Sequence, residues 1–314
     1  MISSFPPPQP APETGPAQGA HPAAPAGGAS PGSRSAWSRQ GRRALRNPLT
    51  VLGLIVILGW IAFAALAPVL TPTSPNEPDL AVRLQAPSTA HPFGTDQYGR
   101  DILVRTIYGA RISMGIGLIS VGISLAVGLP LGAAAGYYGG GTEQVIMRVM
   151  DMVLAFPALV LAMAIAASVG RGLGSAMVAV GLVGVPDFAR LMHAQTLSLR
   201  QKEYVEAAHA IGAGDAVTIL RHIVPNALSP IVVRATLGLG FAVLTAASLS
   251  FLGLGVKPPE AEWGAMVADG REFIVSGQWW ISTFPGLAIM SAVSGFNLLG
   301  DGLRDLLDPR LHDN

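Results

Sequence analysis

The sequence predicts an all-α membrane protein with six transmembrane helices. Half of its residues are apolar and only 12% are charged, whereas a soluble domain carries about 25% charged residues. A helix that crosses the hydrocarbon core needs about 20 predominantly apolar residues, and six segments meet or nearly meet that length. An even number of spans places both termini on the same side of the membrane.

The expected spans differ in how many charged residues and prolines interrupt their apolar sequence. The first carries no charge, the third has Arg148 and Asp151 near its start, and the fourth is interrupted by Pro186 and Asp187. In chain order the six segments are residues 49–70, 112–138, 145–169, 173–192, 228–255 and 282–299.

The charges within these spans are predicted to pair locally. Arg148 and Asp151 are three residues apart, as are Asp187 and Arg190, and this spacing places both members on one helical face. We interpret each as an ion pair at the membrane interface, with a gate or pathway contact as the alternative. Arg234 has no local acid and is expected to extend its side chain to the surface. No substrate-binding residue is assigned from the sequence.

Three glycines of the second span recur every fourth residue. Gly128, Gly132 and Gly136 therefore form a stripe without side chains, which lets a neighbouring backbone approach closely. We expect helix packing there, with a pore lining as the alternative.

Residues 1–47 are expected to form a disordered cytoplasmic tail. They are rich in proline, alanine and glycine, and offer few large apolar side chains to offset the entropy of ordering. They do not resemble a signal peptide, because the first long apolar segment begins only after Pro48. The arginines between Arg34 and Arg46 precede the first span and favour a cytoplasmic N-terminus. The C-terminus is then cytoplasmic too.

Two external segments carry much of the remaining polar chemistry. In residues 71–110, Asp96, Arg100 and Asp101 are expected to cap and pair within a short interfacial helix. A cation site at Asp96 and Asp101 is the weaker alternative, because two carboxylates are few ligands for calcium.

The second external segment, residues 256–281, combines aromatic and acidic side chains. Trp263, Trp279 and Trp280 are expected to lie at the membrane interface, where tryptophan is enriched.

Several kinds of chemistry are excluded. The chain has no cysteine, so it forms no disulfide and has no thiol nucleophile. Its only lysines, Lys202 and Lys257, follow glutamine and valine, so it lacks the Gly-Lys-Ser/Thr of a P-loop. The net charge of +1 argues against a nucleic-acid partner. We expect no enzyme activity, metal or cofactor in this chain.

The polar segment between spans four and five is the most informative part of the chain. Residues 203–230 are expected to form two short helices around a glycine turn outside the lipid, with Gly212 and Gly214 at the break. Gly212 suits the left-handed position after a helix. Asp215 is expected to cap the next helix, and Pro225 to oppose further continuation.

The residues of this segment resemble a known motif. Glu206, Ala207, Ala208, Gly212 and Pro225 follow the spacing of the EAA loop of ATP-binding-cassette (ABC) importer permeases. The chain resembles the C-type permeases of the dipeptide, oligopeptide and nickel group over roughly residues 45–311. Other matching motifs are HPFGTDQYGRD at 91–101, IYGARIS at 107–113, AFP at 155–157, LSFLGLG at 249–255 and GDGLRDLLDPR at 300–310.

That resemblance implies a fold and an organisation. The fold would be that of a binding-protein-dependent, type I ABC importer permease. Residues 48–110 would supply the first helix and an external segment, and residues 111–311 a five-helix core with the EAA loop at about 200–228. The location would be a bacterial cytoplasmic (inner) membrane.

The resemblance also implies a function and partners. The chain would be the transmembrane subunit of an ATP-driven importer of di- or oligopeptides, with nickel chelates or glutathione as alternative substrates. It would pair with a homologous permease, two ATPase subunits that bind ATP and magnesium, and an external substrate-binding protein.

Within the loop, the resemblance assigns roles to four residues. Glu206 would form charged hydrogen bonds with the ATPase, Ala207 and Ala208 would permit a close fit, and Gly212 would set the turn. Two positions depart mildly from the motif, which usually has isoleucine at His222 and leucine at Val224. A secondary transporter or channel, which needs no ATPase, remains a less favoured alternative.

Overall fold

A computed structural model describes residues 47–307, whose regular elements are all helical. The predicted tail up to residue 46, the arginines from Arg34 to Arg46, and Arg310 lie outside the described residues. Five helices are long and apolar enough to cross a membrane, or up to six if a bent pair counts as one span. The predicted all-α membrane fold is confirmed.

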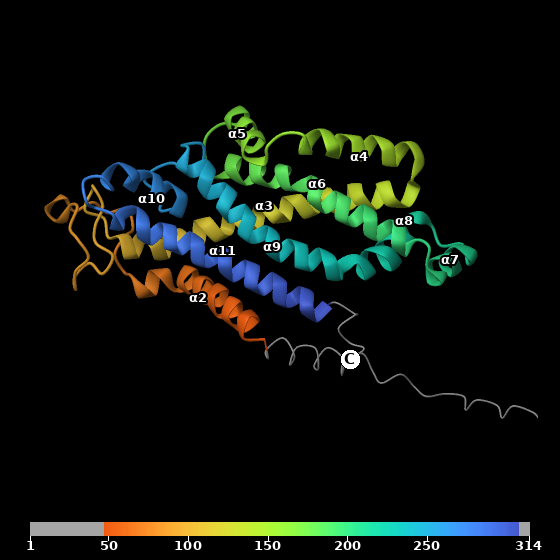
Figure 1. Cartoon of the computed structure of the whole chain (residues 1–314), viewed down its shortest axis with the longest axis horizontal. Helices are drawn as coiled ribbons and strands as arrows, with labels where there is room; N and C mark the ends of the chain where they lie inside the picture. Colours follow the sequence, from red (N-terminus) through yellow and green to blue (C-terminus); the bar gives the residue numbers. More distant parts are fainter. Residues whose placement is uncertain (1–46, 308–314) are drawn as a thin grey trace, which may run out of the picture. The chain divides into compact units, whose positions relative to one another are not determined.

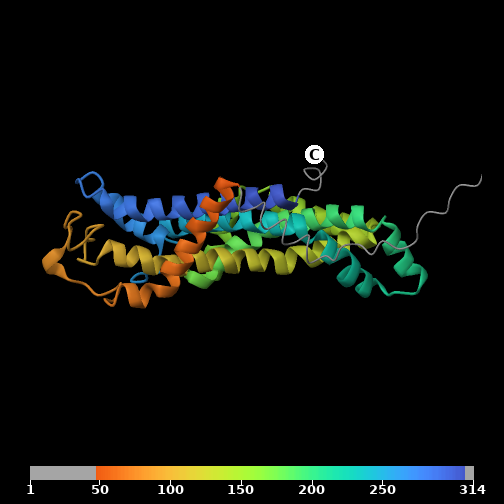
Figure 2. The same cartoon turned by 90° about the horizontal axis from the view of Figure 1, so that it is seen from below.

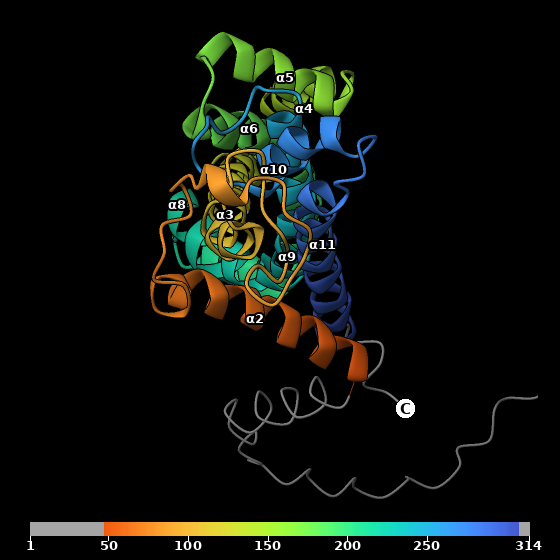
Figure 3. The same ribbon diagram turned by 90° about the vertical axis from the view of Figure 1, so that its left-hand side faces the viewer.

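The long helices form the body of the described structure (Figure 1). In Figure 3, α2 lies on the opposite side of this body from α4 and α5, and Figure 2 shows α2 crossing the other long helices obliquely. The five long helices are α2 (Pro48–Leu70), α3 (Ile102–Tyr138), α6 (Leu173–Leu199), α9 (Val224–Phe251) and α11 (Trp280–Leu307). The shorter elements are η1 (Leu80–Val82), α4 (Gly140–Leu154), α5 (Ala158–Val169), α7 (Glu203–Ala210), α8 (Asp215–Val217), η2 (Thr218–Ile223), α10 (Trp263–Gly270) and η3 (Arg271–Phe273).

The helices extend beyond several of the expected spans. The second span begins at Ile102 rather than at residue 112, so α3 runs through the boundary expected between residues 110 and 111. The fifth is continuous from Asp215 to Phe251, because the short elements α8 and η2 lead directly into α9. Apolarity marks the part of a helix that suits lipid, and these helices continue past it.

The third expected span, residues 145–169, is not one straight helix. The helices α4 and α5 meet at a break and are bent by 94° relative to each other. Pro157 precedes the first residue of α5, and the residue before a proline disfavours the helical conformation. Phe156 occupies that position and is 58% exposed.

The local ion pairs predicted within the spans are wrong. Asp151 of α4 pairs with Arg190 of α6 rather than with Arg148. Asp187 of α6 pairs with Arg234 of α9, so Arg234 has an acidic partner after all. Both ion pairs connect different helices, which spacing along one helix could not reveal.

The glycine stripe packs α3 against α6, and the packing interpretation is confirmed. A Cβ atom added at Gly132 would lie 2.2 Å from the carbonyl oxygen of Ala189. One added at Gly128 would lie 2.8 Å from the carbonyl oxygen of Val185, and one at Gly136 would lie 2.6 Å from Cβ of Thr196. Side chains at these positions would therefore push the two helices apart.

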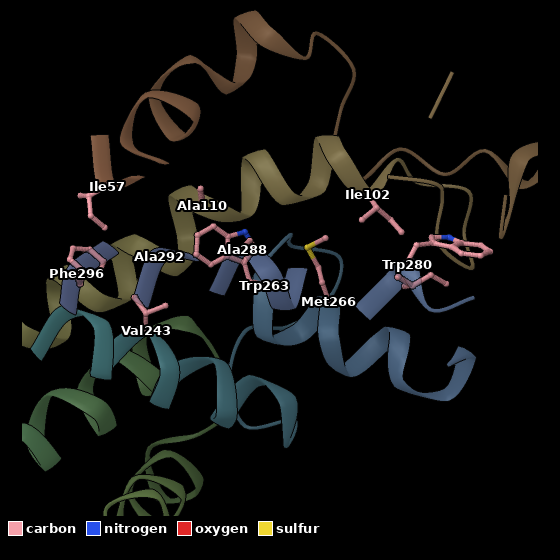
Figure 4. Packing of buried hydrophobic residues seen from close by; sticks show 11 residues of the cluster. Ile57, Ile102, Ala110, Val243, Trp263, Met266, Trp280, Ala288, Ala292 and Phe296 are labelled. Atoms are coloured by element: carbon pink, nitrogen blue, oxygen red, sulfur yellow. The ribbon is translucent and has the colours of Figure 1, made fainter. Parts of the chain in front are cut away.

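Two of the three tryptophans belong to the core rather than to the membrane interface. Trp263 is fully buried and Trp280 is 7% exposed, whereas Trp279 is 50% exposed. The indole of Trp263 donates to the carbonyl oxygen of Thr106 at 2.9 Å. Figure 4 shows the surrounding cluster, whose side chains come from α2, α3, α9, α10 and α11.

The segment of residues 71–110, which is expected to be external, caps and pairs as predicted, but it does not form the expected helix around Asp96 and Asp101. Residues 91–101 make turns, with an isolated bridge between Thr95 and Asp101. Asp101 accepts a hydrogen bond from the amide of Val104 at the start of α3. Asp96 and Arg100 form a buried ion pair at 2.7 Å. No cluster suited to a metal ion occurs within residues 47–307.

A buried carboxylate organises the segment of residues 256–281. Glu262 is 1% exposed and accepts hydrogen bonds from the amides of Gly264 and Ala265 at the start of α10. Ser113 of α3 donates to the same carboxylate at 3.2 Å. Burial raises the pKa of Glu262, and the two amides oppose this shift.

We predict that Gly132→Ala destabilises the protein, because its methyl group would press on the backbone of α6. Overpacking of this kind costs about 1–3 kcal/mol. The matched control is Gly122→Ala on the same helix, where an added Cβ meets nothing within 4 Å. Thermal unfolding in detergent should show a lower melting temperature for the first variant alone. Equal melting temperatures would contradict the close packing of α3 on α6.

Candidate functional site

The polar segment between α6 and α9 is the candidate site. It consists of α7, α8 and η2, and it lies at the end of the long helices opposite to α10 (Figure 1). Two short helices flank a glycine turn, as the sequence predicts. We refer to residues 203–223 as the loop below.

The helix α7 has one face against the protein and one face exposed. Val205 is 1% exposed and Ala208 is 5% exposed. Val205 packs in a cluster with Met192 of α6 and Ile223 of η2. Because the loop shares a core with both neighbouring long helices, it is held as part of the helical body.

The opposite face of α7 is free to contact another molecule. Glu206 and Ala207 are exposed, and Ile211 just after the helix is 87% exposed. Ala208 does not lie on this face, because it is 5% exposed, and only Ala207 of the two alanines presents its short side chain there. A helical period of 3.6 residues turns adjacent alanines about 100° apart, which places one outward and one inward.

The turn after α7 is a Schellman motif. Gly212 has φ +83°, a left-handed conformation that costs little for glycine and is unfavourable for other residues. Its amide donates to the carbonyl oxygen of His209 at 2.9 Å, and the amide of Ala213 donates to that of Ala208 at 3.0 Å. These bonds satisfy carbonyls at the end of the helix. The predicted role of Gly212 in setting the turn direction agrees with this geometry.

Tyr137, at the end of α3, binds both sides of the turn. Its hydroxyl group donates to Oδ1 of Asp215 at 2.9 Å and lies 3.2 Å from Nε2 of His209. The rings of Tyr137 and His209 stack with centroids 6.1 Å apart. Asp215 is therefore a partner of Tyr137, and the prediction that its side chain caps the next helix is wrong, since α8 has no side-chain cap.

Pro225 does not end a helix, contrary to expectation. It lies in the first turn of α9, and the preceding turn Thr218–Ile223 is a π-helix. Proline lacks an amide hydrogen and its ring crowds the carbonyl four residues earlier. A widened turn accommodates both effects, so the helix continues from the loop into the span.

The sequence did not identify two residues that position the loop. They are Tyr137, which lies near the end of the expected second span, and Arg200, which follows the expected fourth span. Arg200 donates to the carbonyl oxygens of Gly136 at 2.9 Å and of Tyr137 at 3.3 Å. The sequence signal was an arginine after one span and a tyrosine near the end of another. Their contact could not be inferred from spacing, because the two residues are more than sixty positions apart.

The structure brings some of the predicted site residues together and separates others. Glu206 and Ala207 share the exposed face of α7, and Gly212 forms the turn beside it. Ala208 lies beneath that face, and Pro225 lies beyond η2 in α9. Within the described residues, the arrangement is an exposed helical face next to a fixed turn.

Two family models match the chain. Residues 128–313 match the binding-protein-dependent transport system inner membrane component. Residues 35–87 match the N-terminal transmembrane domain of oligopeptide transport permease C.

Curated relatives match over most of their length. The chain is 47% identical to the dipeptide transport system permease protein DppC of Alkalihalophilus pseudofirmus, covering 88% of this chain and 91% of the relative. It is 46% identical to the probable D,D-dipeptide transport system permease protein DdpC of Escherichia coli, covering 84% and 88%. It is 44% identical to the glutathione transport system permease protein GsiD of Pectobacterium atrosepticum, covering 88% and 92%.

A solved structure shares the fold. One chain of the MetNI methionine ABC transporter in an inward-facing conformation superposes with a TM-score of 0.55 and 19% identity, covering 65% of this chain and 97% of that chain. With two family models and relatives above 40% identity in agreement, the chain belongs to the family of binding-protein-dependent transport system inner membrane components, as a permease of the dipeptide and oligopeptide ABC importer group.

Proposed function

We propose that the chain is the transmembrane subunit of an ATP-driven importer that moves di- or oligopeptides across the cytoplasmic membrane. The observation that carries this proposal is its likeness to a dipeptide permease over 88% of its length. Glutathione is the second candidate substrate, since a relative named for glutathione transport is 44% identical.

The exposed face of α7 is the proposed contact with an ATPase. Glu206 presents a carboxylate there for charged hydrogen bonds, and Ala207 leaves room for a close approach. Gly212 fixes the direction of the turn. Ala208 supports α7 from its buried face, and Pro225 lies in α9 just after the widened turn η2. The C-terminus of α7 is tied to α3 through Tyr137.

The loop is suited to carry force in the proposed function. Its core contacts reach α6 and α9, and its last turn continues into the span up to Phe251. A push on α7 would therefore move long helices rather than deform a flexible linker. Bending of one permease against another is one of the known ways to open and close such a site.

The remaining components are assigned to partner chains. Two ATPase subunits would bind ATP and magnesium, a homologous permease would complete the pathway, and an external binding protein would deliver the substrate. The loop and both termini would face the cytoplasm.

We predict that the complete importer takes up labelled dipeptide in proteoliposomes only when ATP is supplied on the loop side. The test complex contains this chain with its copurifying permease and ATPases and its binding protein. Uptake by this chain without ATPase subunits would contradict the proposal and favour a secondary carrier.

We predict that Gly212→Val uncouples ATP hydrolysis from uptake. Valine would have to adopt φ +83°, at a cost of about 1–2 kcal/mol, so the turn would change its direction. Gly214→Val is the matched control, because Gly214 has φ −70° and both positions have open space around an added Cβ. Measured in proteoliposomes, peptide uptake per ATP hydrolysed should fall several-fold in the first variant alone. Full coupling in Gly212→Val would remove the role of this turn.

We predict that Glu206→Lys weakens capture of the ATPase subunits. Reversing a charge at a docking surface replaces attraction by repulsion, which costs several kcal/mol at a close contact. Glu203→Lys, at the exposed start of the same helix, is the control for a general charge effect. Copurification should recover about tenfold less ATPase with Glu206→Lys. Equal recovery with both variants would exclude Glu206 from the contact.

A further inference from the structure

A hollow opens between the long helices away from the loop. Its cavity volume is about 110 Å³, which is less than the roughly 300–1,000 Å³ of pockets that enclose a whole ligand, and one side of it is open. Its walls are mostly apolar, and they come from α3, α4, α5, α6 and α9 together with the break at Phe156. The side chains that matter below are Ser120, Ser124, Asp187, Phe188, Arg234 and Thr245.

Asp187 and Arg234 are the only charged residues among those that line this hollow. They form the ion pair between α6 and α9, and the guanidinium group of Arg234 also lies 5.9 Å from the ring centroid of the buried Phe188. The two side chains remain 43% and 36% exposed, respectively. Both charged groups are therefore held in place and still accessible from the open side.

The position of this pair argues against lipid as its neighbour. Asp187 lies near the middle of α6, and Arg234 lies near the middle of the continuous helix Asp215–Phe251. A charged group exposed to lipid within a membrane-spanning helix costs several kcal/mol, and intramembrane charges usually face a water-filled cavity or the bundle interior. The open side of the hollow thus faces water or another protein chain.

The other polar groups of the hollow already have partners. Ser120 donates to the carbonyl oxygen of Met177 at 3.0 Å, Ser124 to that of Gly181 at 2.7 Å, and Thr245 to that of Phe241 at 2.9 Å. Strong recognition of a polar ligand in this hollow consequently depends on Asp187 and Arg234.

We propose that this ion pair contacts the charged termini of a peptide in transit. The Arg234 guanidinium group would donate to the C-terminal carboxylate, and the Asp187 carboxylate would accept from the N-terminal ammonium group. This inference rests on the proposed peptide function and adds its substrate-contacting residues.

Charge balance supports this assignment. The empty pair is neutral, and a peptide with free termini is a neutral zwitterion, so binding brings no net charge into the membrane interior. One ion pair is exchanged for two, each of them a charge-assisted contact of the strong kind. The apolar walls would contact the peptide side chains without hydrogen bonds that select particular side chains, which suits a transporter of varied peptides.

A second ion pair in the same chain provides a matched control. Asp151 and Arg190 also join two helices, and their side chains are 46% and 53% exposed. Neither residue lines the hollow. Any general effect of removing an exposed ion pair between helices should appear equally in both places.

The test compares two double variants in the complete importer with its binding protein. Asp187→Asn with Arg234→Gln removes both charges of the hollow, and Asp151→Asn with Arg190→Gln removes both charges of the control pair. Removing both partners leaves no uncompensated charge, which avoids the large destabilisation caused by single removal. Partner copurification, ATP hydrolysis stimulated by the loaded binding protein, and dipeptide uptake are measured for each.

The hollow variant is expected to assemble fully and to retain stimulated ATP hydrolysis, while its dipeptide uptake falls about tenfold or more. The control variant should keep wild-type uptake. Three results would overturn the inference and assign the pair to packing. They are wild-type uptake by the hollow variant, equal losses of uptake in both variants, and failed assembly of the hollow variant alone. Failure of the unmodified importer to take up any peptide would instead refute the proposed function.

Discussion

The close contact between α3 and α6 is the interaction on which the rest of the structure depends. Because Gly128, Gly132 and Gly136 have no side chains, the backbone of α6 lies directly against α3. That contact brings the end of α3 beside the start of the loop, where Arg200 reaches the carbonyl oxygen of Gly136 and Tyr137 reaches the turn. In a bilayer, where lipid is as apolar as leucine, such close packing replaces the hydrophobic effect as the force between helices.

Charge pairing supplies the second constraint. The four charges of the two ion pairs lie on helices that must otherwise suit lipid, and each finds a partner on a neighbouring helix. Pairs of this kind stabilise the structure weakly when exposed, but leaving one member alone inside a membrane is costly. They therefore fix which helices are neighbours, more than they add to the free energy of unfolding.

The sequence predicts those features that depend on local chemistry. Apolar length revealed most spans, the spacing of Gly128, Gly132 and Gly136 revealed a packing face, and Gly212 revealed the turn. It failed where the decisive partner is distant: Asp151 and Asp187 were assigned to neighbours three residues away, while their true partners are on other helices. Trp263 was misplaced for the same reason, since its burial depends on five helices that meet around it. The break at Pro157 was visible as a proline, but its angle depends on how α4 and α5 pack on α6.

The geometry links the loop to the hollow through two helices. The loop joins α6 to α9, and the Asp187–Arg234 pair bridges these same two helices near their middles. A displacement of α7 relative to the body would act on both helices, because Val205 belongs to one packed cluster with Met192 of α6 and Ile231 of α9. In the proposed function, a movement that separates α6 from α9 would also part Asp187 from Arg234, and the two freed charges would then favour a zwitterion between them. Binding of a peptide and movement of the loop would thus be coupled reciprocally, as any linkage between two sites requires.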